Sequence, residues 1–434
     1  MREMKDSGIE WIGEIPEDWK INSMFQLFTQ VKNKNYTLSE TNLLSLSYGK
    51  IKRKNINTTD GLLPQSFDTY NIVQKNDIVL RLTDLQNDHK SLRVGISNEQ
   101  GIITSAYVTL RNRTNNLSQY LYYYLHSFDV AKGFYGMGSG VRQGLTWDDL
   151  KLFKFVIPSQ KEQQKISAFL DRKCTEIDSV ISKTKATIEE YKKLKQSVIT
   201  QAVTKGIIPN RPMKDSGIEW IGEIPNNYYS RKLKTFADII SKGTTPKDMF
   251  TEINNTYSIR YLKSENIVNN ELSEKPVFSI TEEVNVGELK RSKLSVKDIL
   301  FVIAGASIGK VAIMQKKLLP ANTNQATSFI RIKEKYLYCQ RYIWYVLQSD
   351  LIDTYISLYA VQSAQPNLSM EDLGNIYIPF VNEKKEIEQV IEYLDIKCSE
   401  IDKLIAKKEQ LLTEMENYKK AVIYEYVTGK KEVE

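Results

Sequence analysis

The stretch MKDSGIEWIGEIP decides the organisation of this chain, because it occurs at Met4–Pro16 and again, letter for letter, at Met213–Pro225. A second correspondence follows each copy: LTWDDLKLFKFVIP at Leu145–Pro158 is similar to LSMEDLGNIYIP at Leu368–Pro379. Each of these segments leads into a long, glycine-free stretch rich in Lys and Glu. The order of shared block, variable region and shared stretch therefore occurs twice, so the chain is an internal duplication.

The two Lys- and Glu-rich stretches align without a gap at an offset of 224 residues. In both, apolar residues recur at alternating spacings of three and four, which predicts a coiled-coil helix of roughly 45 residues. Such narrow apolar stripes are not stable alone, so we expect the two helices to pack against each other, antiparallel. The predicted seam consists of Leu170, Cys174, Ile177, Ile181, Ile188, Tyr191, Val198, Leu394, Cys398, Ile401, Ile405, Leu412, Met415 and Val422.

The variable regions combine short β-branched runs with one aromatic helical piece each, which predicts a compact α+β domain in each half. The predicted fold class is thus α+β, with two globular domains joined by two long antiparallel coiled-coil helices and related by a pseudo-two-fold axis. The expected segments are the first domain at 1–157 with repeat block 4–16, the first helix and linker at 158–212, the second domain at 213–379 with repeat block 213–225, and the second helix at 380–434.

Composition narrows the class of protein. The 434 residues, 41% hydrophobic and 26% charged, are typical of a soluble globular chain of two to four domains. No stretch has the apolar length of a membrane span or of a signal peptide. Three cysteines, Cys174, Cys339 and Cys398, form no disulfide framework and fit a reducing cytoplasm, where we expect the protein. The net charge of +7 is compatible with a polyanion partner.

The sequence holds no complete catalytic motif. His89 and His126 are the only histidines, so a multi-histidine metal site cannot be built, and no metal centre is predicted. Gly305–Lys310 (GASIGK) has three residues between its glycines and Val311 after its lysine, whereas a P-loop needs four residues and then Ser or Thr. The Asn/Asp-Pro-Pro-aromatic tetrapeptide of adenine methyltransferases is absent. These observations favour a binding protein over an enzyme.

Polar and basic loops near aromatic residues are the remaining candidates for a functional surface. Arg, Lys, Asn and Gln can contact base edges, and Lys also neutralises phosphate. The candidate DNA-binding residues are Lys50, Lys52, Arg53, Arg81, Gln86, Asn87, Lys90, Arg93, Arg142, Gln143, Arg260, Lys263, Ser264, Asn266, Ser307, Lys310, Gln325 and Gln362. As a set on two related domains, they support contact with nucleic acid.

Together these segments resemble the specificity (S) subunit of Type I restriction-modification enzymes. The resemblance rests on the repeated SGIEWIGEIP block, on the heptad segments IPSQKEQQKISAFLDRKCTEID and IPFVNEKKEIEQVIEYLDIKCSEID, and on phrases such as NDIVLRLTDLQND, GASIGKVAI, VRQGLTWDDL and QPNLSMEDL. It covers essentially the whole chain.

The resemblance implies a division of labour. Each variable domain would be a target-recognition domain for one half of a bipartite, asymmetric site in double-stranded DNA, and the helices would set the gap between the halves. Two modification subunits would supply S-adenosylmethionine-dependent adenine methylation, and restriction subunits would add ATP- and Mg²⁺-dependent translocation and cleavage. This chain itself would be non-catalytic and would hold no cofactor.

Three alternatives remain open from the sequence. The chain could be the specificity adaptor of a modification-only complex or a stand-alone DNA-binding regulator, both of which use the same architecture. It could be a pure coiled-coil assembly scaffold. A self-contained nuclease or ATPase is disfavoured by the missing motifs.

Overall fold

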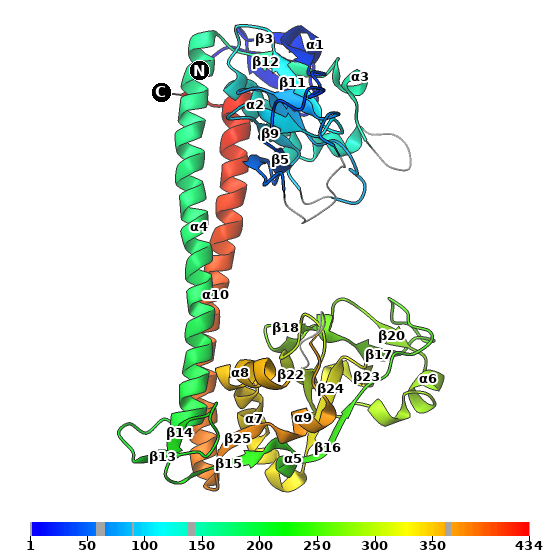
Figure 1. Ribbon diagram of the computed structural model, residues 1–434, viewed down its shortest axis with the longest axis vertical. Helices are drawn as coiled ribbons and strands as arrows, with labels where there is room; N and C mark the ends of the chain where they lie inside the picture. Colours follow the sequence, from blue (N-terminus) through cyan, green and yellow to red (C-terminus); the bar gives the residue numbers. More distant parts are fainter. Residues whose placement is uncertain (1, 58–65, 89–90, 138–143, 361–365, 434) are drawn as a thin grey trace. The chain divides into compact units, whose positions relative to one another are not determined.

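The computed structural model describes residues 2–57, 66–88, 91–137, 144–360 and 366–433. They form two compact units: the first is Met1–Lys185 with Gln410–Glu434, and the second is Ala186–Glu409 (Figure 1). The long helices α4 (Gln160–Lys205) and α10 (Lys384–Val427) each contribute a segment to both units. The boundary between the two units therefore falls within each long helix. The segments expected from the sequence instead give each helix a segment of its own, apart from the globular domains.

The first unit opens with the repeat block, which folds as a hairpin of β1 (Met4–Asp6) and β2 (Glu14–Pro16). The other elements are β3 (Lys20–Ser23), α1 (Met24–Leu27), β4 (Phe28–Gln30), β5 (Leu44–Ser47), β6 (Lys50–Arg53), β7 (Asn71–Val73), β8 (Ile78–Leu80), β9 (Val94–Ile96), β10 (Gly101–Ile103), β11 (Val108–Asn112), α2 (Ser118–Val130), the 3₁₀ turn η1 (Gly133–Gly136), α3 (Trp147–Leu150) and β12 (Lys154–Ile157). Their centre is an antiparallel sheet of order β4-β11-β8-β9, against which α2 packs.

The second unit repeats this framework. Its elements are β13 (Met213–Asp215), β14 (Glu223–Pro225), β15 (Tyr228–Lys232), α5 (Leu233–Phe236), β16 (Ala237–Lys242), β17 (Ile259–Leu262), η2 (Ser264–Asn266), β18 (Ile267–Val268), β19 (Glu271–Leu272), β20 (Ser279–Ile280), α6 (Glu282–Val286), η3 (Lys290–Ser292), β21 (Ile299–Val302), β22 (Val311–Ile313), η4 (Lys316–Leu318), β23 (Ala321–Thr323), β24 (Thr327–Ile332), η5 (Glu334–Cys339), α7 (Gln340–Val346), α8 (Asp350–Tyr359), α9 (Met370–Asn375) and β25 (Tyr377–Val381). The sheet β16-β24-β21-β22 corresponds to the central sheet of the first unit.

One β-branched run of the first variable region is divided between two strands. The apolar run Ile102–Leu110 reads as a single strand in the sequence, but it forms β10 and β11 in two different sheets. The chain turns between them, where the Tyr107 N–H donates to the Thr104 carbonyl at 3.3 Å. β10 pairs with β7, whereas β11 pairs with β4 and β8, so the run serves two sheets instead of one.

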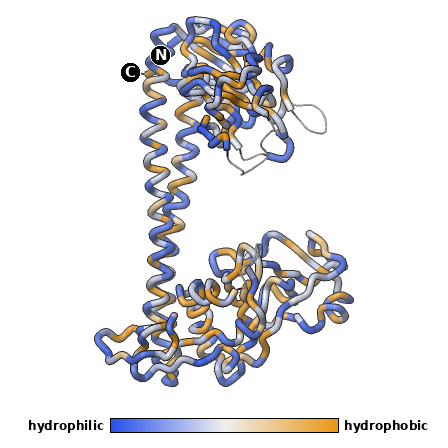
Figure 2. The backbone as a smooth tube through the Cα atoms, in the orientation of Figure 1, coloured by the Kyte–Doolittle hydropathy of each residue, from blue (hydrophilic) through white to orange (hydrophobic). Residues whose placement is uncertain are grey.

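The predicted coiled-coil seam is present in the structure. None of the predicted seam residues is exposed, and hydrophobic and hydrophilic residues alternate along both helices (Figure 2). We number the heptads so that Cys174 and Cys398 occupy position a. Leu170 and Leu394, at position d, have no exposed surface. Burying a leucine completely contributes about 1.5–3 kcal/mol, so repeated apolar positions stabilise the helix pair.

Within each unit the helix segments run antiparallel and are joined by matching ion pairs. Lys419 of α10 donates to Asp178 of α4 at 2.6 Å in the first unit. In the second unit the roles are exchanged, and Lys195 of α4 donates to Asp402 of α10 at 2.7 Å. Because these residues correspond at the offset of 224, the duplication is preserved in contacts as well as in sequence.

Position e of the heptad faces the globular part of each unit. The Tyr123 hydroxyl of α2 donates to Asp171 at 2.6 Å, and the Tyr345 hydroxyl of α7 donates to Asp395 at 2.6 Å. Desolvation and this hydrogen bond raise the pKa of each phenol well above its usual range. Both tyrosines therefore stay neutral donors that fix the domain on its helices.

Position g lies on the other edge of the seam and carries exposed apolar residues. In an antiparallel pair the g positions of the two helices face each other along one edge. The first unit has Val180 and Tyr418 there, and the second has Leu194 and Leu404, each between 42% and 49% exposed. We call these two sets the outward pairs. They occupy equivalent places in the duplication.

His126 of α2 is buried against the helices of the first unit. Its ring stacks on Tyr122 with centroids 5.6 Å apart, and its Nδ1 has no hydrogen-bond partner among the described residues. Its pKa is lowered from 6.5 to about 4, chiefly by desolvation and also by the charge of Lys419, while the charge of Asp178 opposes the shift. The second unit has Gln348 at the equivalent place, which donates to the Trp344 carbonyl at 3.1 Å.

His126 makes the first unit sensitive to acid. Because its folded pKa lies below its unfolded value, its contribution to stability is complete above pH 6.5 and is lost as the pH falls towards 4. At pH 4.5 this loss is about 2.5 kcal/mol. His126→Gln, the residue that the second unit uses, should remove that loss while leaving stability at pH 7.5 nearly unchanged. Urea unfolding followed by hydrogen exchange in 1–185 at both pH values measures it; equal acid sensitivity in wild type and variant would contradict the assignment.

Candidate nucleic-acid interface

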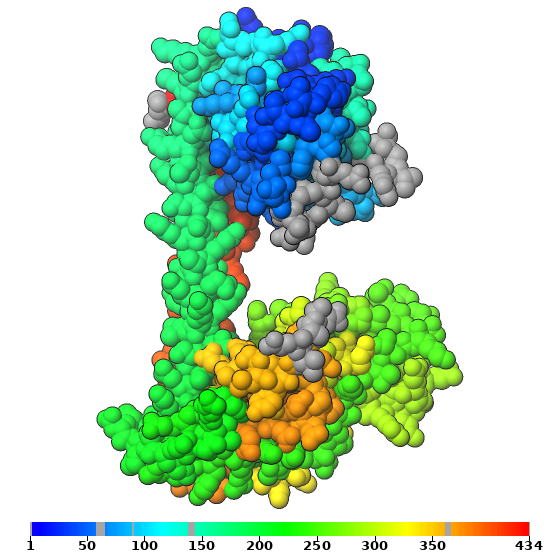
Figure 3. All heavy atoms as spheres, viewed as in Figure 1, coloured from blue at the N-terminus to red at the C-terminus, as the bar shows by residue number. Residues whose placement is uncertain are grey.

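Lys50–Arg53, expected as a polar loop, is the second strand of a hairpin. β5 and β6 pair antiparallel, with Ser45 opposite Lys52 and Ser47 opposite Lys50. Because side chains alternate along a strand, these four residues share one face of the hairpin, and both lysines are exposed. The hairpin lies on the face of the first unit that Figure 3 shows. It therefore presents a surface of hydroxyl and ammonium groups.

The other face of this hairpin is anchored in a small core. Leu44 and Leu46 are buried there, and Ile51 packs against them. Arg53 at the end of β6 is held by a bidentate ion pair with Glu99, whose pKa it lowers. The guanidinium of Arg53 thus neutralises the neighbouring carboxylate and fixes the hairpin, while Lys50 and Lys52 are left to contact a ligand.

The loop between β8 and β9 holds the next candidates, and here the structure corrects one of them. Arg93 is fully buried and donates to the carbonyls of Thr83, at 2.7 Å, and Arg81, at 3.3 Å. Because its guanidinium is buried and bound to carbonyls of its own loop, Arg93 cannot reach a base. It stabilises the conformation of the loop instead. Gln86 and Asn87 are exposed on that loop, which keeps them as candidates.

Two polar contacts stiffen the same loop. Arg81 is half-buried and lies 3.9 Å from a carboxylate oxygen of Asp88. The amide of Asn87 donates to Asp84 at 2.7 Å. Lys90, Arg142, Gln143 and Gln362 lie outside the described residues, so their candidacy stays a prediction.

In the second unit, candidates gather where β17 ends. The Lys263 ammonium lies 3.8 Å from the centre of the Phe278 ring, and Arg260 and Ser264 are half-buried nearby in the chain. Asn266 is a correction: its side chain is 1% exposed, accepts from the Lys263 N–H at 3.0 Å and donates to the Pro276 carbonyl at 2.8 Å. It closes the turn and cannot read DNA.

The GASIGK run forms the tip of an antiparallel hairpin. Gly305 and Gly309 adopt the left-handed region, with φ of +84° and +91°, and the chain continues into strand β22. A P-loop instead leads into a helix, whose N-terminus holds the phosphates. Ser307 is half-buried on this tip and Lys310 is exposed. Gln325, exposed before β24, makes a hydrogen bond with Thr245.

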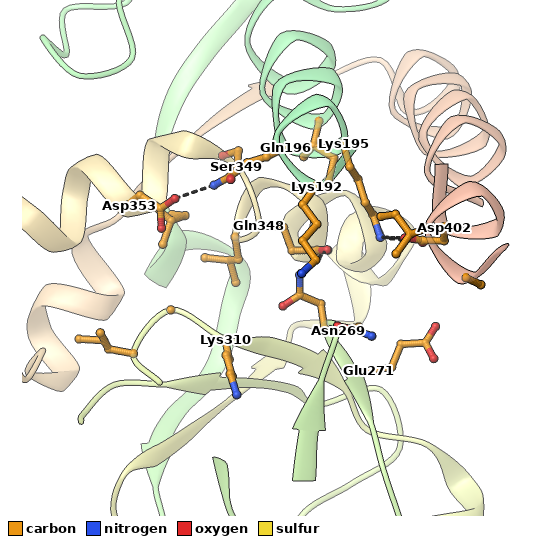
Figure 4. Close-up of a pocket in the computed structure, with 18 of the residues that line it drawn as sticks. Lys192, Lys195, Gln196, Asn269, Glu271, Lys310, Gln348, Ser349, Asp353 and Asp402 are labelled. Carbon is orange, nitrogen blue, oxygen red and sulfur yellow. Dashed lines mark hydrogen bonds and ion pairs between the residues drawn. The ribbon is translucent and has the colours of Figure 1, made fainter. Parts of the chain in front are cut away.

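A groove of about 540 Å³ separates this hairpin tip from the helices of the second unit (Figure 4). Lys192 and Lys195 of α4 line one side, and the turn Asn269–Asn270 and Lys310 line the other. Figure 4 shows Lys192 directed towards Asn269, while Lys310 points away from the helices. Among the described residues, no group of three His, Cys, Asp or Glu side chains is placed to hold a metal ion.

Sequence reasoning missed Tyr48, at the turn of the β5–β6 hairpin. The alternation in LSLSYGKIKR, with Tyr-Gly between two runs of period two, is the signal that would have predicted a hairpin in place of a loop. Tyr48 is 73% exposed, so it joins Lys50 and Lys52 on the candidate surface.

Two domains of one framework, each presenting exposed polar loops and joined through an antiparallel helix pair, define a class of protein with two separate recognition surfaces. The chain matches the family described as Type I restriction modification DNA specificity domain twice, over residues 16–190 and 225–413. Since these two stretches make up most of its length, the chain belongs to that family.

Individual relatives agree with this assignment. The chain is 24% identical over 428 residues to the type I restriction enzyme MjaVIII specificity subunit of Methanocaldococcus jannaschii, covering 96% of this chain and 93% of that protein. It is 24% identical over 264 residues to the EcoBI specificity subunit of Escherichia coli, covering 57% and 53%. A solved structure from a study of complex assembly and conformational transition of the type I R-M system shares the fold, with a TM-score of 0.66 at 12% identity, over 96% of this chain and 99% of that one.

Among the described helices, none combines the length of a membrane span with the apolar character that such a span requires.

Proposed function

We propose that this chain reads a bipartite, asymmetric site in double-stranded DNA, one half with each unit, and carries two modification subunits and the restriction subunits of a Type I complex. The observation that carries the proposal is that one framework occurs twice with different exposed surfaces. The first unit presents the Lys50–Lys52 hairpin, and the second presents Lys263, Lys310 and Gln325. Unequal surfaces on equal frameworks fit unequal half-sites.

Chemistry would then belong to the partners. Specificity subunits of this family are non-catalytic. We infer that S-adenosylmethionine binds to the modification subunits, and that ATP and Mg²⁺ bind to the restriction subunits, so that this chain only positions the DNA. A modification-only complex or a stand-alone regulator would use the same surfaces. Cleavage of unmodified DNA by a complex of this chain with a restriction subunit would support the Type I restriction role and exclude these two alternatives.

The outward pairs support two equivalent partner sites. Val180 with Tyr418 and Leu194 with Leu404 leave apolar side chains on a helix edge that the domains do not cover. Apolar side chains that are exposed next to each other mark contact surfaces, and each outward pair places two of them on one edge of the helix pair. Because the sites are duplicated, they suit two copies of the same partner, and we assign them to the two modification subunits.

The chain, expressed with its modification subunits in a host without adenine methylation, tests the proposal. Sequencing of methylated positions in that genome should yield a single motif of two specified halves separated by an unspecified gap of fixed length. An uninterrupted motif, or methylation without sequence preference, would contradict a two-part reader. No methylation by a correctly assembled complex would contradict the modification role.

A further inference from the structure

The backbone at Tyr48 adopts a conformation that is unfavourable for a tyrosine. The turn between β5 and β6 has φ of +47° at Tyr48 and +74° at Gly49, as in the two-residue turns that favour Asn-Gly. A bulky side chain in the left-handed region is a genuine outlier, because its Cβ approaches the following carbonyl. Such strained residues cluster at functional sites.

The second unit shows what an unstrained version of this turn looks like. β19 packs on β22 as β6 packs on β9, so the turns before β6 and β19 correspond. Asn269 and Asn270 occupy that turn with φ of +51° and +60°. Asn270 donates to Gln348 at 3.0 Å, so the second turn is tied to its own unit. At the corresponding positions the first hairpin has Tyr48, which is exposed like Asn269, and Gly49, which has no side chain to make such a contact.

The surface behind Tyr48 is built for an anion. Its outer face consists of Ser45, Ser47, Lys50 and Lys52, and the hairpin contains no carboxylate. Neither lysine makes a hydrogen bond or ion pair with the described residues. Glu99, the acidic residue that contacts the hairpin, is neutralised by Arg53. The inner face is fixed in the core, so the tip is held in place before it meets a ligand.

Resting on the proposed function, we infer that the β5–β6 hairpin enters the major groove of the half-site bound by the first unit, and that Tyr48 is its specificity-determining residue. A two-stranded ribbon fits the major groove, which is about 12 Å wide, and not the minor groove of about 6 Å. The tip brings the Tyr48 ring and hydroxyl to base edges and thymine methyl groups. Lys50 and Lys52 contact the phosphates on either side.

Tyr48→Asn tests this inference without endangering the fold, since asparagine suits the turn. The probe is a randomised duplex DNA library, from which the chain selects sites while assembled with its modification subunits. Loss of the Tyr48 contact should weaken binding to the wild-type site about ten- to a hundredfold and relax the first half of the motif alone. The thermal midpoint of the free chain should be equal or higher.

Two further variants separate the roles on the hairpin. Lys52→Gln should weaken binding to all DNA sequences alike and lower the slope of log affinity against log salt concentration by about 0.9. Tyr36→Asn, which removes a tyrosine 76% exposed elsewhere in the same unit, should leave the motif unchanged. Equal effects of Tyr36→Asn and Tyr48→Asn would overturn the assignment to the tip.

The possible failures are distinguishable. If wild type selects a bipartite motif and Tyr48→Asn selects the same motif with equal affinity, the inference is overturned and the proposed function stands. If Tyr48→Asn weakens binding to every DNA sequence equally, Tyr48 contacts the phosphate backbone. That result would also overturn the inference that Tyr48 reads bases. If the assembled wild type selects no motif, the proposed function itself fails, and the inference with it.

Discussion

Gly243→Ala should lower the free energy of unfolding of the second unit by about 3 kcal/mol and abolish recognition of the corresponding half-site. A Cβ at this position would lie 1.6 Å from the Thr323 carbonyl oxygen and 2.8 Å from the Asn324 nitrogen. These are backbone atoms, so no side-chain rotation relieves the overlap.

The backbone opposite Gly243 cannot easily move. Thr323 ends β23, which pairs in parallel with β17, and its hydroxyl donates to the Leu262 carbonyl at 2.9 Å. The preceding Asn322 is buried and donates to the Leu289 carbonyl at 3.0 Å. The substitution must therefore displace the loop after Gly243, which carries Thr245 and through it Gln325.

Hydrogen exchange in urea measures this prediction unit by unit. Peptides from 186–409 should lose protection at lower urea in Gly243→Ala, while peptides from 1–185 keep theirs. Gly374→Ala is the matched control, because the nearest atom to its Cβ lies at an ordinary 3.5 Å and alanine favours the helix α9. Wild-type protection throughout 186–409 in Gly243→Ala would show that the Gly243 loop yields at little cost.

The sequence predicts the helices and their seam well because heptad spacing is a local property that packing reinforces. It predicts less of the recognition surface, since burial depends on distant residues. Arg93 and Lys52 are both basic residues near strands, yet Arg93 is enclosed by Tyr135 and the carbonyls of its loop, while Lys52 is exposed. Composition of the loop does not distinguish these two outcomes.

Asn266 illustrates a second limit. Asparagine is as suitable for closing a turn as for reading adenine, because its amide donates and accepts in either setting. The Ser-Glu-Asn sequence after β17 forms a turn, and the Asn266 side chain closes it by accepting a hydrogen bond from the Lys263 N–H. By contrast, the hairpin at Tyr48 has a local signal in the sequence, because period-two alternation flanks the Tyr-Gly pair on both sides.

Leu194→Glu combined with Leu404→Glu should reduce the number of bound modification subunits from two to one. Both residues form the outward pair of the second unit and are about half exposed, so the two replacements together should change stability by no more than about 1 kcal/mol. Two carboxylates buried in an apolar contact would weaken binding by several kcal/mol, about a hundredfold or more. Native mass spectrometry of the assembled complex counts the subunits directly.

The duplication supplies the decisive comparison. Val180→Glu with Tyr418→Glu changes the equivalent pair of the first unit and should also leave one modification subunit, whereas all four changes together should leave none. Ser399→Glu adds a charge at an exposed position b of α10 and should leave both subunits bound. Two subunits on the fourfold variant would show that docking uses another surface. Loss of both from a single altered pair would show that the sites are coupled, in conflict with two equivalent and independent contacts.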